Sequence, residues 1–437
     1  MPSHQAAAGR EFAAERGAQR AARPHTPARA EMRLGTVLLA AAVGHAAAMM
    51  APPSAVVNLT LSPAEAWTPA VNAILAAHPW EHSFGPVFAS HNASLFDHVE
   101  EGKLQMLLEA ARTHLPETAA AIGAIADAIS AHPRGQYVSA QYLAGWLWFH
   151  ELAHTELAKS AQPKACCAVL LAPGPGDEAA AVLSPVAHAR NMDQSPAQVR
   201  NLTMRLTVVG DNAGPPIEVT DWYWITSGFM TAAVPGVASV QENWRFATVP
   251  SAGVFSAAAR GVLPQVLLFR RAFAAAAATP LPPNVTRFDV FAAVVANTEL
   301  AAPMYAAAAG PGPAEGVIIT RDPKGPAEPV EGHGLVRLAD APPLAASGAR
   351  ALVQTNYDRW LPDPPSDPRR TAALAVLRSL PAPIAWTLAG ASAAVNQRPV
   401  LNNETAYTAL MCPRASAGCA SLAGANMASF VRQQQAC

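Results

Sequence analysis

The stretch that decides the fold runs from residue 166 to residue 189 of the 437-residue chain: Cys166-Cys-Ala-Val-Leu-Leu-Ala172, Pro173-Gly-Pro-Gly-Asp177 and Leu183-Ser-Pro-Val-Ala-His-Ala189. The first and last pieces are short apolar runs. The middle piece combines proline, glycine and aspartate, which favour turns. Two apolar runs joined by such a segment predict a β-hairpin. We therefore expect this stretch to open a region in which strands and helices mix.

The sequence differs on the two sides of this hairpin. Ser62-Pro-Ala-Glu65 is a capping box that opens a helix on the N-terminal side. Helix patterns occupy residues 66–77, 102–114, 116–131 and 139–158. On the C-terminal side, strand patterns at 204–209, 217–224 and 316–320 mix with helix patterns at 262–277 and 288–300. The sequence therefore predicts an α+β protein whose all-helical N-terminal piece ends at about residue 165.

Composition narrows the classes of function. Thirty Lys and Arg side chains oppose 31 Asp and Glu, for a net charge of −1. No strong overall field would attract nucleic acid or an anionic membrane, so a nucleic-acid partner is disfavoured. Hydrophobic residues make up 51% of the chain and charged residues only 14%, which allows a large core.

The N-terminus predicts a secretory signal. Residues 34–48 are apolar, follow Arg29 and Arg33, and end in three alanines. This run is short for a membrane span of about 20 residues, although an uncleaved anchor reaching residue 51 is an alternative. Five glycosylation acceptors agree with secretion; they begin at Asn58, Asn92, Asn201, Asn284 and Asn403. In an oxidising compartment Cys412, Cys419 and Cys437 could supply one disulfide, most simply between Cys412 and Cys419, which leaves an odd thiol.

One motif suggests zinc chemistry. His150-Glu-Leu-Ala-His154 places two histidines on one helix face, with a glutamate that could activate a metal-bound water. A third ligand is needed, and the extended motif is absent because Leu157 and Ser160 stand where its glycine and third histidine would be. A zinc peptidase is an alternative function, and a non-enzymatic secreted binding protein is another.

A second pattern is spread along the chain. Its pieces are Val57-Asn-Leu-Thr-Leu-Ser-Pro63, Cys166, Arg190-Asn-Met-Asp193, Gly316-Val-Ile-Ile-Thr-Arg-Asp322, Val353-Gln-Thr-Asn-Tyr-Asp-Arg-Trp360, Asp367-Pro-Arg-Arg-Thr371 and Arg398-Pro-Val-Leu-Asn402. We expect the third piece to be a turn that ends the second strand of the hairpin. In this order the pieces resemble the family of acid ceramidase and N-acylethanolamine-hydrolyzing acid amidase, among the N-terminal-nucleophile hydrolases. The resemblance covers most of the chain after the signal.

The resemblance implies a fold and a reaction. Residues 1–48 would be an extension and signal peptide, 49–165 an α-helical pro-region that becomes the α chain, and 166–437 an αββα catalytic β chain. Self-cleavage before Cys166 would give this residue a free α-amine, which can serve as its general base. The two chains of one precursor would stay partners. The substrate would be a lipid amide, an N-acylethanolamine or a ceramide, and no cofactor or metal would take part.

The resemblance also assigns roles at the site. Arg190 would favour the Cys166 thiolate, and Asp193 would orient the new α-amine. Asn356 would donate to the oxyanion, with Asn243 as a possible second donor. Arg369 would support the site from the far side. Two departures leave alternatives open: Cys167 is a rival nucleophile, and Trp244 stands where the family has a glutamate, unless Glu242 takes that place.

One apolar segment suggests contact with a membrane surface. Residues 254–278 are interrupted by Pro264 and carry Arg270 and Arg271. They suit an interfacial helix pair that reaches a membrane-dissolved substrate, which would make the membrane surface a peripheral partner. Core helices in an alanine-rich protein are the alternative.

Overall fold

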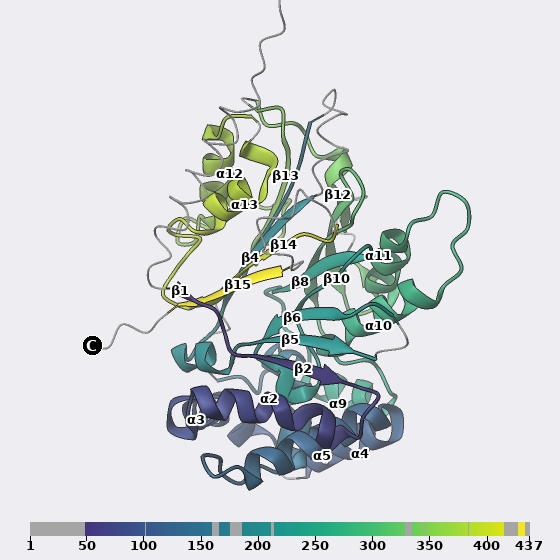
Figure 1. Ribbon diagram of the computed structural model, residues 1–437, viewed down its shortest axis with the longest axis vertical. Coiled ribbons are helices and arrows are strands. Elements are labelled where there is room, and N and C mark those ends of the chain that lie inside the picture. The colour runs from purple at the N-terminus through teal and green to yellow at the C-terminus, as the bar shows by residue number, and fades with distance from the viewer. Residues whose placement is uncertain are drawn as a thin grey trace, which may run out of the picture.

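The computed structural model is an α+β protein with a mainly helical N-terminal region and two β-sheets, as the sequence predicts (Figure 1). The structure describes residues 49–100, 102–159, 166–174, 186–210, 214–327, 334–345, 347–382, 384–414 and 427–432. The expected signal peptide, the residue before Cys166 and most of the turn in the expected hairpin lie outside these ranges.

The N-terminal region contains helices α2 (Pro63–Ala77), α3 (Phe84–Ser94), α4 (Lys103–His114), α5 (Pro116–Ala131), α6 (Ala140–Leu147) and α7 (Phe149–Ala153). The predicted capping box is present, because the Ser62 side chain accepts from the Glu65 amide and the Glu65 carboxylate accepts from the Ser62 amide. The sequence did not predict α3. The single helix expected over 139–158 is divided at Trp148, which is the C-cap of α6 and the N-cap of α7.

The first sheet is antiparallel, in the order β1 (Met49–Met50), β15 (Met427–Arg432), β14 (Thr405–Met411), β4 (Ala187–Asp193), β3 (Cys167–Ala172) and β13 (Arg350–Gln354). The order in the second is β11 (Gly325–Pro326), β10 (Gly316–Asp322), β9 (Met304–Ala309), β8 (Ala238–Trp244), β7 (Thr231–Val234), β6 (Ile217–Asp221), β5 (Met204–Val209) and β2 (Ser54–Asn58), and β12 (Leu335–Arg337) pairs with β10.

The predicted hairpin forms from β3 and β4, with Cys167 paired to Asn191. The β3 side chains are buried on both faces of the sheet. Val169 and Leu171 pack in a cluster that contains residues of α12 (Arg369–Ser379) and α13 (Leu388–Val395), which lie together at one end of the molecule in Figure 1. Ala168 and Leu170 pack against Ala307 and Ile318 of the second sheet. Burial on both faces explains why the run is apolar without alternation.

Three expectations about local structure are wrong. The N-terminal piece is not all helical, because β2 joins the second sheet beside β5, a partner far along the chain. Residues 190–193 are strand rather than turn, because the ladder between β4 and β14 continues to Asp193. The strand expected over 217–224 ends at Asp221, whose carboxylate accepts from the amides of Trp222 and Tyr223 and turns the chain into a 3-10 helix.

The segment proposed for membrane contact packs its large apolar side chains into the fold. It forms α9 (Ser251–Ala259) and α10 (Gln265–Ala278), and α10 packs against α11 (Arg287–Asn297). Val254, Phe255, Leu268 and Phe269 are all buried. This arrangement matches the core-helix alternative. Among the described residues, no helix combines the length and the apolar character that a bilayer span requires.

An aromatic cluster joins the helical region to the second sheet. Trp146 of α6 is fully buried and packs against Phe88, Phe149 and Trp222. We expect Trp146→Ala to lower the free energy of unfolding by about 3–5 kcal/mol, because it leaves a large cavity. Urea denaturation measures this loss. The matched control is Tyr137→Ala, at a side chain that is 83% exposed, and its change should stay within about 0.5 kcal/mol. Equal losses in the two variants would contradict the packing described.

Candidate active site

Cys166 lies directly before β3, and its sulfur contacts a buried cation. The Arg190 Nη2 donates to the Cys166 Sγ at 3.1 Å, and the Met192 Sδ lies 3.4 Å from the same sulfur. Arg190 is fully buried on β4, and its Nη1 donates to the Met230 carbonyl and the Thr231 hydroxyl. The guanidinium is therefore held in place by the second sheet. The structure brings together the predicted nucleophile and the cation expected beside it.

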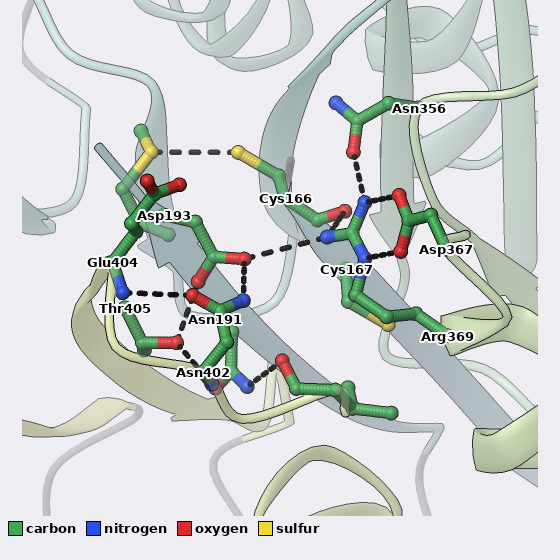
Figure 2. A network of polar contacts seen from close by, with 12 residues as sticks. Cys166, Cys167, Asn191, Asp193, Asn356, Asp367, Arg369, Asn402, Glu404 and Thr405 are labelled. Atoms are coloured by element: carbon green, nitrogen blue, oxygen red, sulfur yellow. Dashed lines mark hydrogen bonds and ion pairs between the residues drawn. The ribbon is translucent and has the colours of Figure 1, made fainter. Parts of the chain in front are cut away.

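The rival nucleophile Cys167 points away from this cation. Its sulfur lies in the apolar cluster under α12 and α13, 4.0 Å from the Ala168 carbonyl oxygen. Figure 2 shows the two sulfurs directed apart, as expected for successive residues at a strand. Both thiols are free, whereas Cys412 is disulfide-bonded and both of its possible partners lie outside the described residues. Of the two adjacent cysteines, the geometry favours Cys166.

Arg369 connects the other predicted residues (Figure 2). From the first turn of α12, its guanidinium donates to Asp193 Oδ2 at 3.3 Å and to Asn356 Oδ1 at 3.2 Å. It also donates to the Cys166 carbonyl at 3.5 Å. Asp367 accepts from its Nε at 2.6 Å and from its Nη2 at 2.7 Å. Cys166, Asp193, Asn356 and Arg369, which are far apart in the sequence, thus share one network.

Asp193 has two further partners to which the sequence analysis gave no role. The Thr405 hydroxyl donates to its Oδ1 at 2.6 Å, and the Asn402 amide donates to its Oδ2 at 2.7 Å. Burial raises the pKa of Asp193 to about 7, against the lowering effect of Arg369 and these two hydrogen bonds. The signal that could have identified Thr405 is its place at a strand end. It is the first residue of β14 and pairs directly with Asp193, the last residue of β4, across the first sheet.

The two candidate oxyanion donors bond to main-chain carbonyls in this form of the chain. The Asn356 amide donates to the Trp244 carbonyl at 2.7 Å. The Asn243 amide donates to the Gln354 carbonyl at 3.0 Å, and its oxygen accepts from Gln241 at 2.6 Å. Asn243 therefore links β8 to the end of β13, whereas its neighbours Glu242 and Trp244 line a cavity with Cys166.

This cavity beside Cys166 is small. Its volume is about 20 Å³, and its lining residues are Cys166, His150, Met192, Asp193, Gln194, Tyr223, Glu242 and Trp244. Such a space holds about one water molecule. Small-molecule pockets usually measure about 300 Å³ or more, so a lipid amide does not fit this form. His150 and Tyr223 were not predicted to share a site with the cysteine.

The side chains of the zinc motif make other contacts. The His150 Nε2 lies 2.9 Å from Glu242 Oε1, and the Glu151 carboxylate accepts from the main-chain N–H of Gln265 at 2.6 Å. The His154 Nδ1 lies 2.8 Å from the Ala247 carbonyl, and its ring stacks on Trp244. Within the described ranges, no three His, Cys, Asp or Glu side chains gather in a metal-binding group. The third ligand that the zinc interpretation requires is not found there.

Burial affects the protonation state of the Cys166 thiol. It raises the pKa of the Cys166 thiol to about 11, although Arg190 lowers it. The thiolate fraction should then be about 10⁻⁴ at pH 7 and rise tenfold per pH unit until pH 11. We expect alkylation of Cys166 by iodoacetamide in the uncut chain to follow this slope between pH 7 and 10. Mass spectrometry of the labelled peptide measures it, and fast, pH-independent labelling would contradict the burial.

Comparisons with known proteins give partial matches. No family model matches the chain. It is 36% identical over 124 residues to rat N-acylethanolamine-hydrolyzing acid amidase, an alignment that covers 28% of this chain and 31% of the rat protein. The rabbit protein of the same name is 37% identical over 117 residues, 27% of this chain and 29% of its own length. The matched part is thus less than a third of these relatives.

A solved structure also matches. It is the Caenorhabditis elegans N-acylethanolamine-hydrolyzing acid amidase ortholog, with a TM-score of 0.45 and 21% identity, over 60% of this chain and 99% of that one. Over less than a third of their length, the rat and rabbit amidases are therefore similar in sequence to this chain.

Proposed function

We propose that this chain is the precursor of a cysteine amidase that cuts itself before Cys166 and then hydrolyses the amide bond of a lipid. One observation carries the proposal: the Cys166 sulfur contacts a buried guanidinium, and its carbonyl belongs to the Arg369 network that also holds Asp193 and Asn356. A cation next to a cysteine favours the thiolate, the nucleophilic form. The Cys167 sulfur lies instead in an apolar cluster, and among the described residues it accepts no hydrogen bond from a guanidinium.

Self-cleavage would follow from attack of the Cys166 thiol on the carbonyl of Ala165. A carbon–sulfur bond forms, the peptide carbon–nitrogen bond breaks, and the nitrogen takes up a proton. Water then opens the thioester, leaving a carboxyl group on Ala165 and a free thiol and amine on Cys166. This proposal accounts for the small cavity, because an uncut precursor has no need to admit substrate.

Turnover would use the new amine as the general base. With an ordinary pKa of about 7.7–8.0, it can take the thiol proton as the sulfur attacks the amide carbonyl of the substrate. Asn356 would turn its amide from the Trp244 carbonyl towards the oxyanion, with Asn243 as a second donor. The leaving amine takes the proton, and water hydrolyses the thioester to release fatty acid.

The same proposal includes the boundaries of the two chains, the layering of the fold and the cellular location. Residues 49–165 would form the α chain and residues 166–437 an αββα N-terminal-nucleophile β chain. One face of β3 packs against residues of the second sheet, and its other face packs against α12 and α13. This arrangement supports the layering. We place the protein in the secretory pathway, in an acidic lysosome-like compartment or outside the cell, with a membrane surface as peripheral partner.

The substrate class can be tested directly. Protein incubated at about pH 5 is given an N-palmitoyl ethanolamide and, separately, a ceramide in detergent micelles, and released fatty acid is measured by mass spectrometry. We expect one of the two to be hydrolysed by the wild type and neither by Cys166→Ser. No hydrolysis of either amide by a chain that has been cut before Cys166 would exclude lipid amides as substrates.

A further inference from the structure

A second titratable pair shares the cavity with Cys166. His150 of α7 and Glu242 of β8 both line it, and their exposed fractions are 3% and 2%. The His150 Nε2 lies 2.9 Å from Glu242 Oε1. The amidase chemistry proposed above gives neither side chain a role, and the motif that contains His150 has no zinc site in the described part of the chain.

The contact with Glu242 fixes which ring nitrogen can accept a proton. The His150 Nε2 is directed at the Glu242 carboxylate, which accepts hydrogen bonds, so Nδ1 is the ring nitrogen left to take a proton. This Nδ1 is buried and has no hydrogen-bond partner within the residues described. An imidazole that is held by a carboxylate at one nitrogen and unbonded at the other is the usual arrangement of a general base beside a nucleophile.

The uncut chain needs such a base. The nitrogen of Cys166 is still part of the peptide bond to Ala165, so the α-amine that would serve in turnover does not yet exist. Burial keeps the Cys166 thiol protonated. The Asp193 carboxylate already accepts from three donors, and burial raises the pKa of Tyr223 well above its ordinary value. Among the residues that line the cavity, the His150–Glu242 pair remains, and His150 is the member of the pair with an unbonded ring nitrogen.

We infer that His150, oriented by Glu242, is the general base of self-cleavage; the inference rests on the proposed function. His150 takes the thiol proton, directly or through the one water that the cavity can hold, as the sulfur attacks the Ala165 carbonyl. The imidazolium returns this proton to the Cys166 nitrogen when the carbon–nitrogen bond breaks. His150 then takes a proton from the water that attacks the thioester and passes it to the departing sulfur. The sum is one water added across the peptide bond.

The test follows self-cleavage of the full chain at about pH 5 by intact mass. We expect His150→Ala to slow it at least about 100-fold, the usual contribution of a general base. Free imidazole should restore part of the rate, because it fits the space that the ring leaves. The matched control is His154→Ala, which removes an equally buried ring four residues away and should change the rate less than about threefold.

Glu242 is a positioning residue, so its variants test orientation. We expect Glu242→Gln to slow cleavage about tenfold or more and Glu242→Asp to recover part of the rate. Wild-type cleavage rates in His150→Ala, or a slow rate that imidazole does not restore, would overturn the inference while leaving the proposed function standing. A wild-type chain that never cuts before Cys166 would overturn both.

Discussion

Replacing Cys166 with alanine is expected to leave the chain in one piece and without amidase activity. The sulfur is the atom that attacks in both self-cleavage and turnover, and no other thiol contacts Arg190 among the described residues. Loss of a nucleophile lowers kcat by about 10⁶-fold in comparable enzymes, so no activity should be measurable. Intact mass after incubation at about pH 5 and release of fatty acid are the two measurements.

The neighbouring cysteine provides the control. Cys167→Ala removes a sulfur from the apolar cluster under α12 and should cost only about 1 kcal/mol of stability. Cleavage and activity should persist. If Cys167→Ala stays uncut while Cys166→Ala is processed, the two cysteines have been assigned the wrong way round.

The second large effect on activity is expected from replacing Asp193 with asparagine. The carboxylate is fully buried beside Arg369 and would pair with the α-amine of the cleaved Cys166. Asparagine keeps the size but removes the charge, so the amine loses its anchor. We expect kcat/KM to fall about 100- to 1,000-fold, comparable to the loss of one oriented polar group in other sites. Initial rates on processed enzyme measure the change.

The control for Asp193→Asn is a neighbouring buried carboxylate. Asp363 lies 3.1 Å from Arg370 and accepts from the Thr371 main-chain amide. Asp363→Asn should lower stability by a similar amount, about 1–3 kcal/mol, with activity within about threefold of wild type. Equal losses of activity in both variants would show that Asp193 acts through folding alone.

The sequence predicted the parts of the structure that depend on neighbours along the chain. The apolar runs on either side of residues 173–177 predicted β3 and β4, and Ser62 and Glu65 predicted the start of α2. Residues 204–209 form β5 as expected. The order of motifs brought Cys166, Arg190, Asp193, Asn356 and Arg369 into one hypothesis, and the structure brings them into contact.

The features that were missed depend on contacts between distant residues. β2 is a strand because β5 lies beside it, and its own five residues carry little signal. His150 was assigned to a zinc motif because Glu151 and His154 are near it in sequence, but its hydrogen bond is to Glu242, 92 positions away. Asp193 was expected in a turn because its partner Thr405 is 212 positions away. No local pattern encodes these pairings.

The central claim is that the peptide bond before Cys166 is cut and the thiol gains a free amine on its own backbone. Purified wild-type chain, held at about pH 5 until it is active, should be separated into its products and sequenced from the N-terminus. We predict a product that begins Cys-Cys-Ala-Val. A fully active preparation in which Ala165 is still joined to Cys166, and Cys166 to Cys167, would contradict the account.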